Sequence, residues 1–293
     1  MKPLKNKVAV VAGATRGAGR GIAVCLGEAG ATVYCTGRSL RGQIATAGRT
    51  ETIDETATLV TARGGTGIAV QVDHTVEAQV RGLFERIETE QGRLDLLVND
   101  VWGGDELAEW GLPFWEQSLE KGLLMQQRAV HSHIITARYA APMMVRQGYG
   151  LIIEITDGDT PDYRGNFFYD LAKSSNIRLA HAMAEELRPR GVTALALTPG
   201  FLRSEAMLDH FGVTEATWRD AIAQDLHFAA SETPTYIGRA VAALASDPNI
   251  AVKSGQAWST WRLVKEYDFA DADGSQPDWG AHYAKFLASQ ADG

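Results

Sequence analysis

The stretch that decides the fold is VAVVAGATRGAGRGIA, residues 8–23. A run of apolar residues that favours a buried strand is followed by a glycine-rich turn and by the start of an apolar helix. Gly13, Gly17 and Gly19 in the turn have the spacing G-x3-G-x-G. Glycine lets the backbone turn sharply and approach a ligand, and the free N–H groups that open the next helix favour a phosphate. We therefore predict a turn that binds a phosphate-bearing ligand.

The same alternation of short apolar runs and longer amphipathic segments continues along the chain. It predicts an α/β protein with a Rossmann-type, doubly wound parallel sheet of about seven strands and helices on both faces. The predicted strands are residues 8–12, 32–36, 68–72, 94–98, 151–156, 192–197 and 255–259, and the predicted helices are residues 17–29, 51–63, 76–91, 116–147, 167–188 and 233–246. No repeat or linker divides the chain, so we expect residues 1–293 to form a single domain with a surface loop at 39–51 and a polar, aromatic-containing C-terminal extension at about 260–293.

The composition excludes several classes of function. The chain has 293 residues, of which 45% are hydrophobic and 22% charged, as expected of a globular protein with a large core. Apolar runs long enough to span a membrane and the features of a signal peptide are missing, so we expect no membrane association and a cytoplasmic location. The net charge of −8 argues against nucleic acid as a partner. Cys25 and Cys35 are expected to be reduced core thiols.

The residues after the second predicted strand indicate which dinucleotide the turn would bind. An NAD site commonly has an acid here that binds the ribose hydroxyls, whereas this chain has Gly37 and Arg38. An arginine suits a 2′-phosphate, and Arg16, which follows Thr15 in the glycine turn, is placed to reach the same phosphate. Two cations and no acid therefore predict NADP (NADPH) as the cofactor, with Thr15 among the residues that bind it.

Two further polar residues close predicted strands. Asp73 ends the third strand and Asn99 ends the fourth. The carboxyl ends of the strands in a doubly wound sheet face the ligand crevice. We predict that Asp73 accepts a hydrogen bond from the adenine amine and that Asn99 supports the turn and the cofactor. The alternative for each residue is an ordinary cap or turn position.

The helix predicted after the fifth strand carries the candidate catalytic residues. Tyr169 and Lys173 are one helical turn apart, so the phenol and the ammonium share a face. A phenol beside a cation ionises more easily. The strand before it ends in Thr156 and Asp157, and a carboxylate near the phenol would have the opposite effect.

Together these motifs resemble the short-chain dehydrogenase/reductase family over residues 5–260. The resemblance rests on the glycine turn, Asp73, Asn99, the Tyr169-x3-Lys173 pair and TPGFLRS at 198–204. It implies hydride transfer between a nicotinamide and a carbonyl or alcohol carbon, with Tyr169 as the proton donor in reduction. Lys173 would bind the nicotinamide ribose and lower the pKa of Tyr169.

The resemblance also assigns residues after the sixth strand and an assembly. Pro199 and Gly200 would bring backbone against the nicotinamide carboxamide, with Ser204 hydrogen-bonding nearby. The long predicted helices 116–147 and 167–188 resemble those through which family members pair, which implies a homodimer or a homotetramer.

The chain departs from the family pattern at two positions. Family members usually have a serine at the end of the fifth strand, and alignment places either Thr156 or Asp157 there. Adjacent strand residues face opposite ways, so only one of them is expected to face the crevice. The family also has an asparagine for a proton relay in the helix before this strand, where we align Ala129.

These observations predict an NADP-dependent carbonyl reductase that acts on a small ketone, aldehyde or alcohol. If Asp157 faces the crevice, a protonated carboxyl would donate to the carbonyl, and activity would favour reduction and fall as pH rises. The alternatives are an NADP-binding sensor or scaffold with impaired chemistry, and a dehydratase or epimerase. No metal site is predicted. Three tryptophans after the fourth strand either line an apolar substrate pocket or pack on the surface: Trp102, Trp110 and Trp115.

Overall fold

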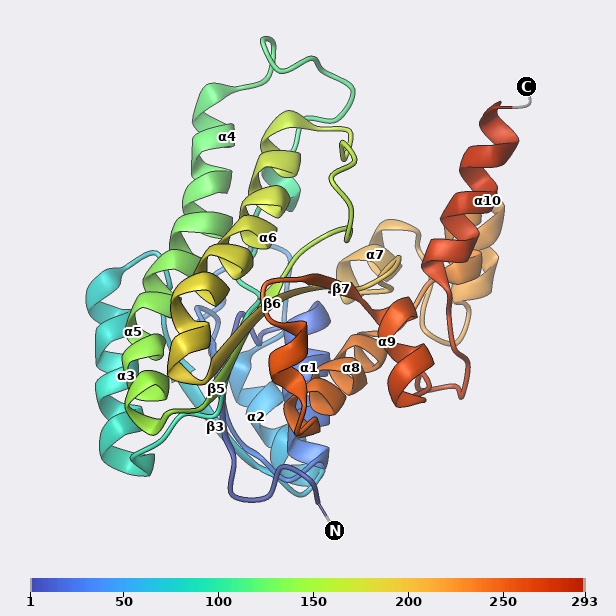
Figure 1. The fold of residues 1–293 in the computed structure, drawn as a ribbon. Coiled ribbons are helices and arrows are strands. Elements are labelled where there is room, and N and C mark those ends of the chain that lie inside the picture. Colours follow the sequence, from blue (N-terminus) through green and yellow to red (C-terminus); the bar gives the residue numbers. More distant parts are fainter. Residues whose placement is uncertain (1, 292–293) are drawn as a thin grey trace.

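The computed structural model describes residues 2–291 and has one parallel sheet at its centre (Figure 1). The seven strands lie in the order β3-β2-β1-β4-β5-β6-β7. They are β1 (Val8–Ala12), β2 (Thr32–Gly37), β3 (Thr66–Gln71), β4 (Leu96–Asn99), β5 (Gly150–Ile155), β6 (Val192–Thr198) and β7 (Ala257–Ser259). The predicted Rossmann-type sheet is confirmed, and each strand ends within two residues of its prediction.

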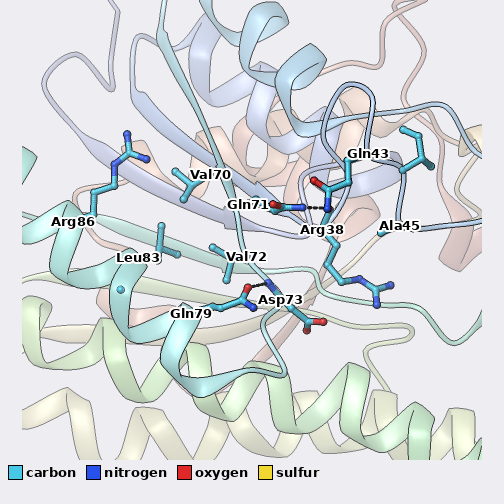
Figure 2. Close-up of a pocket in the computed structure, with 12 residues that line it drawn as sticks. Arg38, Gln43, Ala45, Val70, Gln71, Val72, Asp73, Gln79, Leu83 and Arg86 are labelled. Atoms are coloured by element: carbon cyan, nitrogen blue, oxygen red, sulfur yellow. Dashed lines mark hydrogen bonds between the residues drawn. The ribbon is translucent and has the colours of Figure 1, made fainter.

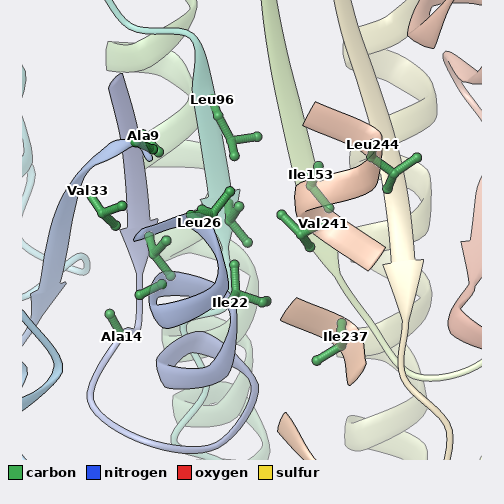
Figure 3. Packing of buried hydrophobic residues seen from close by; sticks show 14 of the residues in the cluster. Ala9, Ala14, Ile22, Leu26, Val33, Leu96, Ile153, Ile237, Val241 and Leu244 are labelled. Atoms are coloured by element: carbon green, nitrogen blue, oxygen red, sulfur yellow. The ribbon is translucent and has the colours of Figure 1, made fainter. Parts of the chain in front are cut away.

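Helices cover both faces of the sheet, as the buried residues show. One face is packed against α1 (Gly17–Glu28), α2 (Ile53–Ala62), α8 (Pro234–Ser246) and α9 (Thr260–Tyr267). The other face is packed against α3 (Glu77–Gln91), α5 (Ser132–Gln147) and α6 (Phe167–Leu187). Figure 3 shows the first layer, where side chains of α1 and α8 pack on the strands through Ile22, Leu26, Ile237, Val241 and Leu244.

The prediction of one helix over residues 116–147 needs correction. The segment begins as α4 (Leu119–Gln126), passes through a π-helical turn (Gln127–His131) and continues as α5. Ser118 caps α4 by accepting a hydrogen bond from the backbone N–H of Lys121, which fixes the start three residues later than predicted. A π turn inserts an extra residue into the helix, and such turns are common at functional sites.

The predicted C-terminal extension contains helices that the sequence reading did not define. After α9, the helix α10 (Trp279–Ala291) packs against the 3-10 helix Leu226–Ala230, in the segment between β6 and α8. Trp279 of α10 packs on Phe201 with ring centroids 5.9 Å apart. The extension therefore backs the segment that leaves β6.

No helix within residues 2–291 has the combination of length and apolar character that crossing a membrane requires.

The parallel register determines where functional residues gather. Ala12 pairs with Thr36 and with Asn99, and Asn99 pairs with Glu154. The carboxyl ends of these strands consequently lie along one edge of the sheet, and the loops that follow them meet there.

Helices α1 and α8 approach each other closely at two glycines. A Cβ atom on Gly21 would lie 2.0 Å from the carbonyl oxygen of Pro234, and one on Gly238 would lie 2.5 Å from the carbonyl oxygen of Gly21. Larger residues at either position would push the helices apart.

We predict that Gly21→Ala destabilises the fold by about 1–3 kcal/mol, because the added methyl overlaps backbone that cannot move independently of α8. Chemical denaturation measures this change. Gly82 is the matched control, since it also lies within a helix but a Cβ atom added there would meet nothing within 4 Å. Gly82→Ala should stabilise the protein by up to about 1 kcal/mol. Equal effects of the two substitutions would contradict the close-packing argument.

Candidate active site

The glycine turn forms a close-fitting cradle at the end of β1. Gly13 has a φ of +92°, and a Cβ atom there would lie 2.4 Å from the carbonyl oxygen of Asp100. A Cβ on Gly19 would lie 2.3 Å from the carbonyl oxygen of Gly13. Only glycine fits these positions, as in a turn that brings backbone against a pyrophosphate. Burial raises the pKa of the Asp100 carboxyl, which lies against this turn, to about 7.

The first N–H group of α1 already holds an anion. The N-cap residue Arg16 makes no side-chain capping bond, and the Gly17 N–H donates to Glu205 Oε2 at 2.7 Å. A carboxylate thus stands where the helix N-terminus favours a phosphate oxygen. The donors of the turn are therefore suited to a dinucleotide pyrophosphate. The sequence reading missed Glu205 because it is 188 positions from Gly17 in the chain.

Arg38 and Asp73 line one surface cavity of about 670 Å³ beside β3 and α3 (Figure 2). The Gln71 side chain donates to the Arg38 carbonyl at 2.9 Å. Burial raises the pKa of Asp73, but hydrogen bonds from Thr75 and the charge of Arg38 outweigh burial and leave it below its usual value. The loop at residues 39–51, predicted only as surface, contributes cavity-lining residues Gln43, Ile44 and Ala45.

Arg16 is not among the residues that line that cavity, and its charge acts on the carboxyl of Glu51. Within residues 2–291 neither Arg16 nor Arg38 has an ion-pair partner within 4.0 Å. Both guanidinium groups are therefore free for an anionic ligand. Thr15 is buried between the turn and β2. It packs so closely on Gly37 that a Cβ atom added to this glycine would lie 2.6 Å from Thr15 Oγ1.

Asn99 is fully buried and belongs to a polar network beneath the site. Its Nδ2 donates to Glu154 Oε1 at 2.7 Å. Glu154 Oε2 lies 2.6 Å from His133 Nδ1, and His133 Nε2 lies 3.0 Å from the carbonyl of Val101. The network thus connects β4 and β5 to the turn after Asn99. The sequence reading missed both Glu154 and the part that His133 has in this network.

Thr156 and Asp157 both follow the end of β5, and their side chains contact α6 at different points. Thr156 is buried, and its hydroxyl donates to the Lys173 carbonyl at 2.8 Å. Asp157 is exposed, and its Oδ2 accepts a hydrogen bond from the Tyr169 hydroxyl at 2.8 Å. The structure therefore brings the carboxylate, and not the threonine hydroxyl, to the phenol.

The environment of Tyr169 keeps its hydroxyl protonated. Burial raises the pKa of the phenol well above its usual value, and the negative charge and hydrogen bond of Asp157 raise it further. Burial also lowers the pKa of Lys173, against the opposing charges of Asp157 and Asp100. The ammonium has no hydrogen-bond partner within residues 2–291 and lies 4.1 Å from the centroid of the Trp102 ring.

Two of the three predicted tryptophans pack around Tyr169. Trp102 meets it edge-on with centroids 5.4 Å apart, and Trp110 meets it tilted at 5.3 Å. Trp115 is 71% exposed and contacts Phe114 instead. Trp102 and Trp110 therefore form an aromatic wall at the phenol.

Arg164 organises the loop that carries Asp157, a role that the sequence reading did not predict. Its guanidinium donates to the backbone carbonyls of Asp157, Thr160 and Asp162. It also pairs with the Asp170 carboxylate at 2.9 Å. The loop between β5 and α6 is thus fixed by one side chain.

The segment after β6 lies against the glycine turn. The Gly200 N–H donates to Glu232 Oε2 at 2.9 Å, and Ser204 caps α7 (Glu205–His210) by accepting a hydrogen bond from the N–H of Met207. Burial raises the pKa of Glu232 to about 8. Pro199 precedes Gly200 directly, and its carbonyl accepts a hydrogen bond from the Thr198 hydroxyl at 2.8 Å.

The predicted relay position, Ala129, lies buried within the π turn and supplies no polar side chain. Across residues 2–291, no three acidic, histidine or cysteine residues are grouped as a metal site would need.

Comparison with known proteins identifies the family. The family model described as "Enoyl-(Acyl carrier protein) reductase" matches residues 13–258. The human and mouse proteins named dehydrogenase/reductase SDR family member 1 are each 36% identical to this chain over 93% of its length and 85% of theirs. A 3-oxoacyl-(acyl-carrier-protein) reductase from Synechocystis is 28% identical over 88% of this chain and 97% of its own.

Solved structures share the fold. A structure from Xanthomonas campestris aligns with a TM-score of 0.76 at 25% identity and covers 94% of both chains. A short-chain type dehydrogenase/reductase from Mycobacterium marinum aligns with a TM-score of 0.68 at 22% identity, covering 87% of this chain and 94% of its own. The chain therefore belongs to the short-chain dehydrogenase/reductase family, whose members are oxidoreductases that bind a nicotinamide dinucleotide and act on CH–OH or C=O groups.

Proposed function

We propose that the protein is an NADP(H)-dependent reductase of ketones or aldehydes. The observation that carries this proposal is the hydrogen bond of 2.8 Å between Tyr169 and Asp157, at the edge of the sheet where the glycine cradle also lies. A phenol that stays neutral is the acid that carbonyl reduction needs.

The residues of the cradle and the strand ends suit NADP. The N–H groups of the glycine turn would hold the pyrophosphate, and Arg38 would bind the 2′-phosphate, with Arg16 as a second cation. Lys173 would bind the nicotinamide ribose, since its ammonium is otherwise uncommitted within residues 2–291. Pro199 and Gly200 would contact the carboxamide. Bound there, the nicotinamide supplies the hydride.

Tyr169 would give its proton to the oxygen of the reduced carbonyl. Asp157, one of the two residues that alignment offers for the family's serine, raises the phenol pKa, so it would favour the direction in which Tyr169 acts as an acid. Oxidation needs the phenolate as a base and is disfavoured for the same reason.

We also propose that the protein forms a homodimer or a homotetramer. Apolar side chains of α4 and α6 are exposed in the single chain, and burial in an oligomer would remove them from water. They are Leu119, Leu123, Phe167 and Leu171.

The first prediction concerns the cofactor. Arg38→Ser should weaken NADPH binding at least about tenfold and leave NADH binding unchanged, because it removes a charge-assisted contact to the 2′-phosphate. Fluorescence titration of both dinucleotides measures this difference. Arg41→Ser is the control, since Arg41 is exposed and lies on the same loop. Equal losses for both dinucleotides would contradict the assignment of Arg38.

The second prediction concerns the proton donor. Tyr169→Phe should lower kcat/KM for reduction of a ketone and aldehyde panel by about a hundredfold or more, with NADPH binding retained. Tyr163→Phe is the control and should have no effect, because Tyr163 lies on the preceding loop and is 65% exposed. NADPH binding without oxidation in any variant would indicate the sensor or scaffold alternative. Product formed without net change in the cofactor would indicate a dehydratase or epimerase.

The third prediction concerns pH. Because the pKa of Tyr169 is raised, ketone reduction should persist into the alkaline range and fall only as the phenol ionises. Asp157→Asn removes the like charge, so the alkaline limb of the kcat/KM profile should move to lower pH and alcohol oxidation should increase. Asp162→Asn is the control, because Asp162 is an exposed acid on the same loop. A profile of Asp157→Asn identical to wild type would exclude this role.

A further inference from the structure

Asp157 is one of the two residues that alignment offers for the family's serine, and a carboxylate beside the Tyr169 hydroxyl changes which substrate the site favours. The carboxylate is exposed and lies 2.8 Å from the Tyr169 hydroxyl. Negative charge develops on a carbonyl oxygen as hydride adds to the carbon, and an ionised carboxylate beside that oxygen opposes this charge. The same carboxylate attracts a substrate that carries a positive charge at the reacting group.

The other charged groups strengthen this preference. The Lys173 ammonium is the cation of the site, and three acids act on it: Asp157, Asp100 and Asp105. The other cation that acts on Lys173 is Arg164, whose side chain is only 8% exposed and already forms an ion pair at 2.9 Å. Because burial raises the pKa of Asp100 to about 7, that carboxyl is only partly ionised at neutral pH, so Asp157 and Asp105 are the acids that chiefly offset the Lys173 charge there.

The aromatic residues at Tyr169 also favour a cation. The ring of Trp102 already has the Lys173 ammonium 4.1 Å from its centroid, in a cation–π contact. Trp110, whose ring centroid is 5.3 Å from that of Tyr169, is 57% exposed and offers a second face. An exposed carboxylate and an exposed indole thus both lie at the same phenol, where the carboxylate would attract a cation and the indole face would stack on a flat one.

We propose that the preferred substrate of this site is an iminium, a carbon–nitrogen double bond whose protonated or alkylated nitrogen carries the positive charge. This proposal rests on the hydride-transfer function proposed above and names the class of substrate. Hydride from the reduced nicotinamide adds to the iminium carbon, and the electron pair of the C=N π bond becomes the lone pair of an amine nitrogen. The nicotinamide is oxidised and the iminium is reduced.

The iminium reaction uses no proton from the protein. Tyr169 therefore keeps its hydrogen, which agrees with a phenol whose pKa is raised by burial and by Asp157. In this reaction Asp157 acts by contacting the cationic substrate, and Tyr169 acts by holding the carboxylate in place.

The test compares two bicyclic substrates of the same size, the N-methyl-dihydroisoquinolinium ion and the neutral ketone tetralone. We expect kcat/KM with NADPH to be at least about tenfold higher for the ion. Asp157→Ser restores the hydroxyl that the family usually has and should lower the ion-to-ketone ratio at least about tenfold. Asp162→Ser removes a charge from the same loop and should leave the ratio unchanged. Unaltered NADPH affinity shows that each variant is folded. If Asp157→Ser does not fold, Asp157→Asn is used in its place.

Binding provides a second readout that does not depend on turnover. The N,N-dimethyl-tetrahydroisoquinolinium ion has no reducible bond, and calorimetry should show that it binds the NADPH-loaded protein at least about tenfold more tightly than tetralol. Asp157→Ser should remove this difference.

The outcomes separate the two proposals. Reduction of tetralone with an ion-to-ketone ratio that Asp157→Ser does not change would overturn the iminium proposal and leave the reductase function standing. Reduction of neither compound would count against the reductase function, and the binding comparison would then decide the cation preference. Equal affinities for the ion and for tetralol would overturn that preference.

Discussion

The parallel pairing of β1 with β2 and β4 is the constraint on which the rest of this structure depends. It puts Ala12 beside Thr36 and Asn99. Three segments therefore begin at the same edge of the sheet: the glycine turn, the loop with Arg38 and the turn with Asp100. Extending the same register through β5 brings the loop with Asp157 to that edge. The helix α6, which follows this loop, then brings Tyr169 to Asp157.

The chemistry of the site follows from a balance of charges around one phenol. Lys173 alone would make Tyr169 easier to ionise, whereas burial and Asp157 make it harder, and the latter effects win. This balance shows how the site accommodates both a lysine and an aspartate beside one tyrosine. A tyrosine beside both a lysine and an aspartate is suited to remain an acid, or to remain uninvolved in proton transfer while the aspartate meets a cation.

The sequence predicted the parts of this protein that depend on local patterns. Apolar strands and the glycine spacing determine the sheet and the cradle, because burial and backbone geometry leave few alternatives. It could not decide between Thr156 and Asp157, since two alignments gave different residues and only the folded loop shows which side chain contacts the phenol. The contacts of Glu205 and Glu154 join elements that are far apart in the sequence, and those of Arg164 depend on the folded path of the loop between β5 and α6, so no local pattern could reveal them. The helices of the extension were missed because their aromatic packing partners lie far away in the sequence.

The carboxylate of Glu205 on the Gly17 N–H has a consequence for the order of events in turnover. If the pyrophosphate binds there as proposed, it would replace Glu205, the first residue of α7, on that donor. Arg49 joins the same helix, through Asp209, to the loop beside the cavity, so a shift of α7 would also affect that loop. The helix α7 follows directly on the segment proposed to contact the nicotinamide. We therefore expect ordered binding, in which the dinucleotide binds before the substrate and dissociates after the product.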